Sequence, residues 1–440
     1  MRKSLLVTGF SALALLLVPV GAASGPGHGT APSIKGFTVF GVHTKEQRSQ
    51  LVAEGYDIGE AYWPDYVHLY GTEKQVLALA LRGFRVVPSE VLAPDDFPPE
   101  DSNYHNYAEM LADMQAVAAA HPATVRLFSL GTSYEGRNLI GARVSNDPTD
   151  NLSEPGAFFV GQHHAREHLS VEVVLSLLHL FAESTAPNVT RLVNTRQIYI
   201  VPSLNPDGGE YDIATGSYRF WRKNRQPTQG IFGTDQNRNY SYKWGCCGGS
   251  SGQPGSETYR GPSALSTPED ARMSDFMIAH PNVTTGISYH SYGDLVLYPY
   301  GYTYTDLPPD MTVLDHQTFV AMGAEIARTT GYTDQQSSDL YITDGDWNDW
   351  MYGALHRYPI TIELSGYNQG FYPPDEVIPT EIAKNRQAAI YVAAIADCPT
   401  KVAPVNRTRD RRCASPSKAS LGKQTRSMRR RAPARLLRPS

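Results

Sequence analysis

Short apolar runs alternate with stretches of helical spacing from residue 104 onward. Runs rich in β-branched and aromatic residues, typical of strands, occupy residues 125–130, 139–144, 157–160, 197–201, 285–289 and 358–363. Helical spacing of apolar positions covers residues 107–121, 169–185, 267–280, 312–330 and 376–396. Strands that alternate with helices in this way predict an α/β domain with a largely parallel or mixed β-sheet.

Residues 34–90 show the same alternation on a smaller scale. Strand-like runs at 37–42, 66–70 and 84–87 are separated by predicted helices at 44–54 and 73–81. The first of these helices has the spacing of a capping box, with Thr44 as N-cap and Gln47 three residues later. An acidic, proline-rich stretch at 93–102 follows. The pattern indicates a small α/β module joined to the larger domain by an exposed, cleavable linker.

The two ends of the chain differ in composition from its body. Two basic residues precede the apolar stretch 5–18, which Pro19 follows directly, so it is too short to span a bilayer and resembles a secretory signal peptide. Residues 401–440 hold 13 Lys and Arg against one acid, a pattern typical of disordered tails. The other 400 residues hold 26 basic and 43 acidic side chains. This acidic body gives no reason to expect nucleic-acid binding, and no later segment is apolar enough to anchor the chain in a membrane.

The chain has four cysteines, Cys246, Cys247, Cys398 and Cys413. An even number in an exported chain predicts disulfides. Adjacent cysteines rarely bridge each other, and Cys413 lies in the basic tail. The hypothesis from the sequence is therefore that Cys246 or Cys247 pairs with Cys398.

A dense polar cluster, Gly161-Gln-His-His-Ala-Arg-Glu-His168, lies between a strand-like run and a predicted helix. Loops at such junctions carry functional groups on a rigid scaffold. A hydrolytic zinc site needs three protein ligands and an open position, and His164 with Glu167 can supply two ligands from one turn. The third ligand is best sought at the end of a later strand, where His290 follows the run 285–289.

Further downstream, one carboxylate and several guanidinium groups complete the candidate chemistry. Glu363 lies in a strongly apolar strand, where an unpaired carboxylate is costly, so it is either paired or functional. A raised pKa near a metal would suit a general base. Arg222 and Arg238 lie in segments rich in cations, and such groups can stabilise an oxyanion or bind a substrate carboxylate.

Taken together, these segments resemble the zinc metallocarboxypeptidases of the pancreatic carboxypeptidase A/B family, and most of all its secreted actinomycete members. The resemblance covers about residues 104–398, and residues 34–95 take the place of the family's activation segment. Any single block is weak, but the ordered set is very specific. The blocks that carry it are His164-Ala-Arg166-Glu167, Asn205-Pro-Asp-Gly208, Trp221-Arg222-Lys-Asn-Arg225, Asn237-Arg238-Asn239, His290-Ser-Tyr292, Leu297-Tyr-Pro-Tyr-Gly301, Tyr341, Asp349-Trp350 and Thr361-Ile-Glu363-Leu.

The resemblance implies a peptide hydrolase that removes the C-terminal residue of peptides and proteins with one zinc ion. His164, Glu167 and His290 would bind the zinc. Glu363 would act as general base on the metal-activated water and then pass the proton to the leaving amine. Arg222 would polarise the scissile carbonyl and stabilise the oxyanion.

The resemblance also implies how substrate is held. Asn237 and Arg238 would bind the terminal carboxylate, with help from the phenol of Tyr341 on a mobile loop. Arg166 and Tyr292 would line the outer subsites of the cleft. A carboxylate clamp of this kind restricts cleavage to a chain end.

On this interpretation the chain has four parts: a signal peptide at 1–23, an activation segment at 24–100, a catalytic domain at 101–399 and a basic tail at 400–440. The expected fold of the catalytic domain is a mixed, twisted β-sheet flanked by helices. The expected protein is a secreted monomer whose partners are peptide C-termini. Retention of the N-terminal module as a spacer is the alternative to its removal.

In this family a residue at the base of the side-chain pocket separates preference for apolar from preference for basic C-terminal residues. Here that position is Asn348, which is neither apolar nor acidic. Asp346, two residues before it, could receive Lys or Arg, and Gly301 and Thr361 leave room for a large side chain. We therefore predict a broad preference that includes apolar, aromatic and basic residues.

Three alternatives remain open from the sequence. His164-Ala-Arg-Glu167-His168 also fits the H-x-x-E-H pattern, in which both histidines bind the metal and Glu167 is the base. An amidohydrolase or deacylase could use the same scaffold. A non-catalytic peptide-binding or wall-binding protein is the third alternative, and it leaves the set of ligands, base and oxyanion arginine without a use.

Overall fold

The computed structural model describes residues 35–62, 65–88, 101–147, 149–214, 218–364 and 370–404. The predicted signal peptide, Cys413 and nearly all of the predicted linker and basic tail lie outside the described residues. Two parts of the chain, an N-terminal module and a larger domain, are built around separate β-sheets.

The N-terminal module, residues 35–88, consists of an antiparallel sheet with two helices. Its described strands follow the order β2-β3-β1-β4. The predicted capping box at Thr44 and Gln47 is confirmed. The sequence did not predict β2, because its residues are largely polar or small. The elements are β1 (Lys35–Phe40), α1 (Lys45–Ala53), β2 (Asp57–Tyr62), β3 (Tyr66–Gly71), α2 (Glu73–Leu81) and β4 (Arg85–Pro88).

The larger domain is built on a sheet whose eight described strands follow the order β13-β12-β14-β11-β7-β8-β6-β5. The central strands β14, β11, β7 and β8 run parallel, and antiparallel pairs lie on both sides of them, which confirms the predicted mixed sheet. The strands are β5 (Val125–Thr132), β6 (Asn138–Val144), β7 (Gly156–Val160), β8 (Gln197–Val201), β11 (Val283–Ser291), β12 (Leu295–Tyr298), β13 (Thr333–Gln336) and β14 (Tyr358–Leu364).

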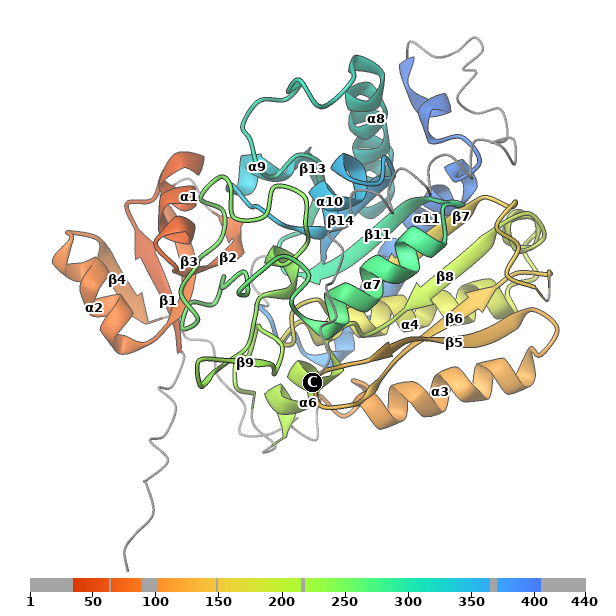
Figure 1. Ribbon diagram of the computed structural model, residues 1–440, viewed down its shortest axis with the longest axis horizontal. Helices are drawn as coiled ribbons and strands as arrows, with labels where there is room; N and C mark the ends of the chain where they lie inside the picture. Colours follow the sequence, from red (N-terminus) through yellow and green to blue (C-terminus); the bar gives the residue numbers. More distant parts are fainter. Residues whose placement is uncertain are drawn as a thin grey trace, which may run out of the picture. The chain divides into compact units, whose positions relative to one another are not determined.

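Helices cover both faces of this sheet (Figure 1). The five predicted long helices are confirmed to within two residues at each end, whereas the sequence did not predict the short helices α5, α6, α9 and α10. The helices are α3 (Tyr107–Ala120), α4 (His168–Glu183), α5 (Pro187–Val193), α6 (Pro206–Ile213), α7 (Pro268–Ala279), α8 (Val313–Thr330), α9 (Ser337–Leu340), α10 (Trp347–Gly353) and α11 (Ile378–Ile395).

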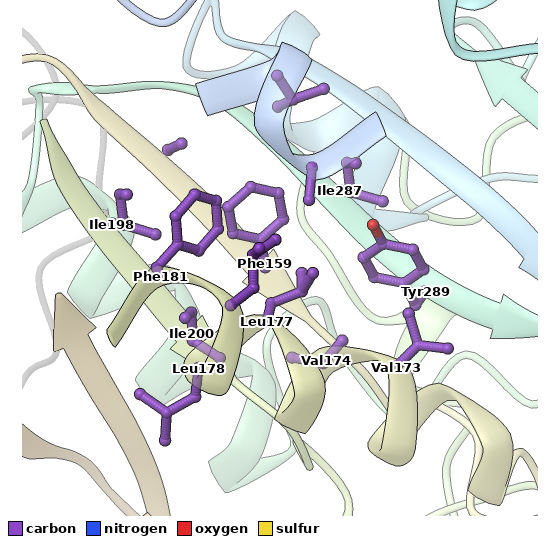
Figure 2. Packing of buried hydrophobic residues seen from close by; sticks show 14 of the residues in the cluster. Phe159, Val173, Val174, Leu177, Leu178, Phe181, Ile198, Ile200, Ile287 and Tyr289 are labelled. Atoms are coloured by element: carbon purple, nitrogen blue, oxygen red, sulfur yellow. The ribbon is translucent and has the colours of Figure 1, made fainter. Parts of the chain in front are cut away.

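Alternate residues of the buried strands face opposite helical layers. Ile198 and Ile200 of β8 pack with Phe159 and Phe181 against α4, as Figure 2 shows. Tyr199, between the two isoleucines, belongs to the cluster on the other face, with α7 and α10. This alternation follows from the two-residue period of a strand. Burying one such large apolar side chain contributes about 1.5–3 kcal/mol, so the sheet is a rigid support for the loops at its edge.

The parallel strands place the candidate chemistry at one edge of the sheet. β7 leads directly into the loop 161–167, His290 lies near the end of β11, and Glu363 lies near the end of β14. The register pairs His290 with Glu363 across the β11–β14 ladder. Functional sites of open α/β sheets are found at the carboxyl ends of such strands.

Among the described residues, no single helix is long and apolar enough to cross a membrane. Helices α4 and α5 meet the length and hydropathy criteria only as a pair, across a bend of 94°.

The cysteine hypothesis is wrong. The structure joins Cys246 to Cys247, and Cys398 belongs to a separate disulfide. The adjacent pair lies in a glycine-rich loop, where Asp344 accepts hydrogen bonds from the N–H groups of Cys247 and Gly249. The general rarity of bridges between neighbours misled the prediction, because this loop can adopt the local backbone that such a bridge requires.

Candidate metal centre and substrate cleft

Three side chains converge at the edge of the sheet in the pattern of a metal site. The ligand atoms of His164, Glu167 and His290 all lie within 4.8 Å of one another, and the three residues are buried. Glu167 places one carboxylate oxygen 2.7 Å from Nδ1 of His164 and the other 2.8 Å from Nδ1 of His290. The Nδ1 atoms of the two histidines are 3.2 Å apart. Two imidazoles and one carboxylate form a set of ligands typical of catalytic zinc.

A buried carboxylate behind the site sets the orientation of the first ligand. Oδ1 of Asp235 lies 3.2 Å from Nε2 of His164. With the proton on Nε2, this contact leaves the lone pair of Nδ1 directed at the centre of the cluster, as expected for a metal-binding imidazole. Asp235 also accepts a hydrogen bond from Nε of Arg222 at 3.0 Å. Burial raises the pKa of Asp235, but Arg222 and His164 outweigh this and hold it well below its ordinary value.

A pocket adjoins this cluster and brings together most of the predicted cleft residues. Glu363 lines it from β14, and Asn237 and Arg238 come from the short 3₁₀ helix Gln236–Arg238, which follows Asp235. The full lining is His164, Asn237, Arg238, Leu297, Ser337, Leu340, Tyr341, Thr343, Asp346, Asn348, Thr361 and Glu363. Residues from five separate segments of the chain therefore meet at one concave surface.

The predicted carboxylate clamp is held by bonds to the backbone. Asn237 accepts a hydrogen bond from the N–H of Trp347 through its side-chain oxygen, which leaves its amide NH₂ as the group available to an anion. Arg238 donates from Nε to the carbonyl of Gly249 and from Nη1 to the carbonyl of Asn237. These bonds fix two donors next to each other at the pocket wall.

The base of the pocket is polar. Asn348 donates to the carbonyl of Leu297. Asp346 accepts hydrogen bonds from the N–H of Asp349 and the hydroxyl of Thr343. Burial raises the pKa of Asp346, and burial together with the charge of Asp346 raises that of Asp349 well above its ordinary value.

Gly301 lies beside Thr343 and Asp346, which both line the pocket. A Cβ atom at this position would clash with the hydroxyl of Thr343 and approach Asp346. The absence of a side chain thus allows Thr343 to pack against Asp346. Thr361 does line the pocket, as predicted.

The outer cleft residues contact the N-terminal module. Both terminal nitrogens of Arg166 donate to the carboxylate of Asp57, at 2.6 and 3.0 Å, and the two residues are buried. The phenol of Tyr292 lies 2.7 Å from the phenol of Tyr70. Tyr341 is buried in an apolar cluster with Leu51, Val67 and other residues of the module. The subsites predicted for substrate are therefore covered by residues of the same chain.

The comparison with known families supports the chemistry of this site. Residues 110–388 match the model of a family described as zinc carboxypeptidase. The chain belongs to the zinc carboxypeptidase family. With its His–Glu–His cluster, it is a zinc-dependent metallocarboxypeptidase, a hydrolase that acts at the C-terminal end of peptides.

Several relatives match over most of their length. This carboxypeptidase is 36% identical to a zinc carboxypeptidase of Saccharothrix mutabilis subsp. capreolus over 428 residues, which cover 91% of this chain and 98% of the relative. It is 33% identical to carboxypeptidase B of Astacus astacus over 288 residues, which cover 63% of this chain and 92% of the relative. These matches include both a bacterial and an animal enzyme.

Solved structures confirm the fold. Carboxypeptidase A from Helicoverpa armigera aligns with a TM-score of 0.70 at 22% identity, over 84% of this chain and 98% of its own. Thrombin-activatable fibrinolysis inhibitor aligns with a TM-score of 0.67 at 23% identity, over 83% of this chain and 99% of its own. Both alignments cover more of this carboxypeptidase than the family match does.

The two histidines beside the first ligand lie outside the metal cluster. Nε2 of His168 lies 3.0 Å from Asp212, and the ring of His163 lies between the hydroxyls of Ser288 and Tyr240. The H-x-x-E-H alternative is therefore wrong for this carboxypeptidase, because His290 and not His168 joins His164 and Glu167.

Sequence reasoning missed the acids that support the site. Asp235 stands two residues before Asn237, yet nothing marked it as a partner of His164 and Arg222. Asp57 and Asp212 were also missed. No sequence motif could have identified Asp57 or Asp212, because Asp57 lies 109 residues from Arg166 and Asp212 lies 44 residues from His168 along the chain.

Proposed function

We propose that this carboxypeptidase is a secreted exopeptidase in which Glu363 is the general base and the N-terminal module is a removable inhibitory segment. The observation that carries the proposal is the meeting of Glu363, the ligand His164 and the clamp pair Asn237 and Arg238 around one pocket. A base, a metal ligand and a carboxylate-binding pair at this spacing suit hydrolysis of the last peptide bond of a chain.

The proposed chemistry assigns one task to each group. Zinc bound by the His–Glu–His cluster supplies Lewis acidity toward water and the scissile carbonyl. Glu363 takes a proton from the attacking water and gives it to the leaving amine. Arg222, held by Asp235, donates to the oxygen that becomes negative in the transition state.

Asn237 and Arg238 supply the specificity for chain ends. Both residues line the pocket, and an amide NH₂ beside a guanidinium suits the two oxygens of a terminal carboxylate. An internal peptide bond presents no such anion, so the same donors would be left buried without a partner. This penalty favours exopeptidase over endopeptidase activity.

The polar base of the pocket supports a preference that includes basic residues. Asp346 can accept an ammonium or guanidinium group, and Leu297 with the methyl group of Thr361 offers apolar contact to aromatic side chains. We propose broad side-chain specificity on this basis.

The contacts of the N-terminal module support its role as an inhibitory segment. Asp57 accepts a hydrogen bond from Arg166, and the phenols of Tyr70 and Tyr292 are hydrogen-bonded to each other. The side chain of Arg48 in α1 donates to the backbone carbonyls of Asp339 and Leu340, which directly precede Tyr341. A peptide substrate would need these same groups. Cleavage of the linker after residue 88 would release them.

A pair of matched peptides tests the proposed function. The full chain is secreted, treated with a glutamyl endopeptidase to cut the acidic linker, which holds Glu100 and no Lys or Arg, and incubated with a peptide that ends in Phe and with the same peptide amidated at its C-terminus. We expect release of free Phe from the acid only, loss of activity with a chelator, and recovery with zinc. Equal cleavage of the amide would favour an amidohydrolase, and N-terminal sequencing of the secreted protein would show whether the module is removed.

A further inference from the structure

One carboxylate outside the catalytic cluster collects an unusual number of donors. Asp212, at the end of α6, is fully buried. It accepts hydrogen bonds from the backbone N–H of Trp221 at 2.8 Å, from the N–H of Arg219 at 3.2 Å and from the phenol of Tyr372 at 2.9 Å. Its second oxygen lies 3.0 Å from Nε2 of His168.

The backbone held by Asp212 has a strained conformation. Phe220, between the two N–H donors, has a φ angle of 54°, in the left-handed region that residues with a side chain rarely adopt. Its own N–H donates to the phenol oxygen of Tyr372, which in turn donates to Asp212. Such a conformation persists only where the surroundings hold it in place. Three successive N–H groups are thus fixed around one anion.

This strained turn lies directly before Arg222. The guanidinium of Arg222 donates to Asp235, and the N–H of the preceding residue, Trp221, donates to Asp212. The carbonyl of Arg222 accepts a hydrogen bond from the N–H of Ala165, between His164 and Glu167. The backbone around Arg222 is therefore hydrogen-bonded to the metal-ligand loop through Ala165 and to Asp212 through Trp221.

Helix α6 links the same two segments at its other end. Asn205, its N-cap, donates from its amide nitrogen to the carbonyl of His163 at 3.1 Å and to the carbonyl of Lys223 at 3.2 Å. Asp212, near the C-terminal end of the helix, likewise contacts both segments, because its carboxylate is hydrogen-bonded to His168 and to the N–H of Trp221. This one short helix thus connects the residues flanking the first two metal ligands to the residues flanking Arg222 at two points.

We infer that Asp212, with His168 as its donor, is a positioning residue that sets Arg222 against the metal ligands for the reaction. The inference rests on the proposed role of Arg222. It assigns to His168 the role of a hydrogen-bond donor to Asp212 rather than that of a metal ligand. A carboxylate suits the position because its neighbours are donors: two backbone N–H groups, a phenol and an imidazole. An amide would turn an NH₂ group toward one of these donors and release part of the turn.

The substitution Asp212→Asn tests the inference against a matched control on the same helix. Asp207 is also buried in α6 and accepts bonds from Ser133, Arg137 and the N–H of Glu135, away from the cleft. In the full chain after cleavage of the linker, we expect D212N to lower kcat by roughly 100-fold, the scale of a 1 Å misplacement, with KM within about twofold. D207N should stay within about threefold of wild type per folded, zinc-loaded molecule.

Hydrogen exchange gives a readout that does not depend on activity. In D212N, the amides of Arg219, Phe220 and Trp221 should exchange faster, while those of β11 stay protected. Zinc content should remain at one per chain in both variants. Equal kinetics for D212N and D207N, or a loss of kcat in D212N without faster exchange at these amides, would overturn the inference.

A second pair of variants covers the case in which D212N folds poorly. His168→Gln keeps a nitrogen donor toward Asp212, whereas His168→Leu removes it. We expect H168Q to retain most of the activity that H168L loses, again in kcat rather than KM. Equal loss in both would contradict the positioning role. An inactive wild type would instead count against the proposed function, so the two failures can be told apart.

Discussion

The inner part of the cleft, which holds the metal ligands and Arg222, and the outer part, which holds Arg166 and Tyr292, receive their hydrogen bonds from different parts of the chain. At the inner part, the ligands and Arg222 are fixed by groups of the catalytic domain itself, chiefly Asp235 and the backbone around α6. At the outer part, Arg166 and Tyr292 are paired with Asp57 and Tyr70 of the N-terminal module. The bonds named for the first region come from the catalytic domain, whereas those named for the second come from the N-terminal module.

This difference indicates how activation would work. The bonds described above from Asp235, Asn205 and Asp212 lie within the catalytic domain, so we expect the inner site to keep its arrangement when the module leaves. The outer cleft only needs to be uncovered, and its arginine and tyrosine then become available to substrate. Removal of the module should therefore change access to the cleft and leave the chemistry of the inner site intact.

The largest expected effect comes from the inner site. Glu363→Gln should lower kcat by about 10²- to 10⁴-fold, because the amide cannot take the proton of water. Zinc content, measured by metal analysis, should stay at one per chain, since Glu363 is not part of the His–Glu–His cluster. Glu381→Gln is the control, because Glu381 is equally buried but bonds Tyr332 and is not among the residues that line the pocket. A fully active E363Q enzyme would remove Glu363 from the mechanism.

The second-largest expected effect comes from a substitution in the outer cleft. Asp57→Ala leaves Arg166 buried without its partner, and breaking a buried pair in this way costs about 3–5 kcal/mol. We expect the uncut chain to become partly active and to unfold at lower temperature, as followed by peptide hydrolysis and calorimetry. After the linker is cut, the variant should match wild type.

An exposed aspartate in the same module provides the control for this experiment. Asp65→Ala should leave the uncut chain as inactive as wild type. If D57A and D65A behaved alike, the module would not block the cleft through Arg166, and the contrast between the inner and outer regions would lose its main support.

The sequence predicted the inner region far better than the outer one. His164, Glu167, His290 and Glu363 could be placed because strand-like runs and ordered motifs locate them at the carboxyl ends of parallel strands. Asp57 could not be placed, because its strand is polar and its partner lies 109 residues away. Periodicity reports which face of an element is buried, but it does not report which distant charge will meet a given arginine.

The pairing of the cysteines failed for a related reason. Sequence spacing alone does not fix connectivity, and the geometry of the glycine-rich loop decided it. The long helices were predicted to within two residues, because apolar spacing is reliable over such lengths. The short helices α6 and α10 were missed, although both carry residues that support or line the site.

A smaller effect is expected at the base of the pocket. Asp346→Asn should lower kcat/KM for a peptide ending in Arg by roughly tenfold, or about 1.4 kcal/mol, with little change for the matched peptide ending in Phe. Asn keeps the N-cap of α10, so the helix should persist. An equal loss on both peptides would mean that Asp346 only supports the fold of the pocket.

The pH dependence of this preference follows from the same residue. Because burial raises the pKa of Asp346, its carboxylate takes up a proton at a higher pH than an ordinary aspartate. The charge of Asp344 also raises this pKa, whereas the hydrogen bond from the N–H of Asp349 and the charge of Arg238 lower it without cancelling the effect of burial. The ratio of Arg to Phe cleavage should therefore fall as the pH is lowered, and D346N should abolish this slope. A ratio that rises on acidification would contradict the assignment.

The smallest effect is expected from the disulfide between Cys246 and Cys247. A bridge between neighbours closes no long loop, so it removes little entropy from the unfolded chain. The loop is held instead by Asp344, which accepts bonds from Cys247, Gly249 and Ser250, and Gly249 in turn accepts from Arg238. The double variant C246S/C247S should lose less than about 1 kcal/mol of stability in urea unfolding. Asp344→Asn should cost more and should raise KM, because it loosens the support of Arg238; the reverse order would make the disulfide the main support of the carboxylate clamp.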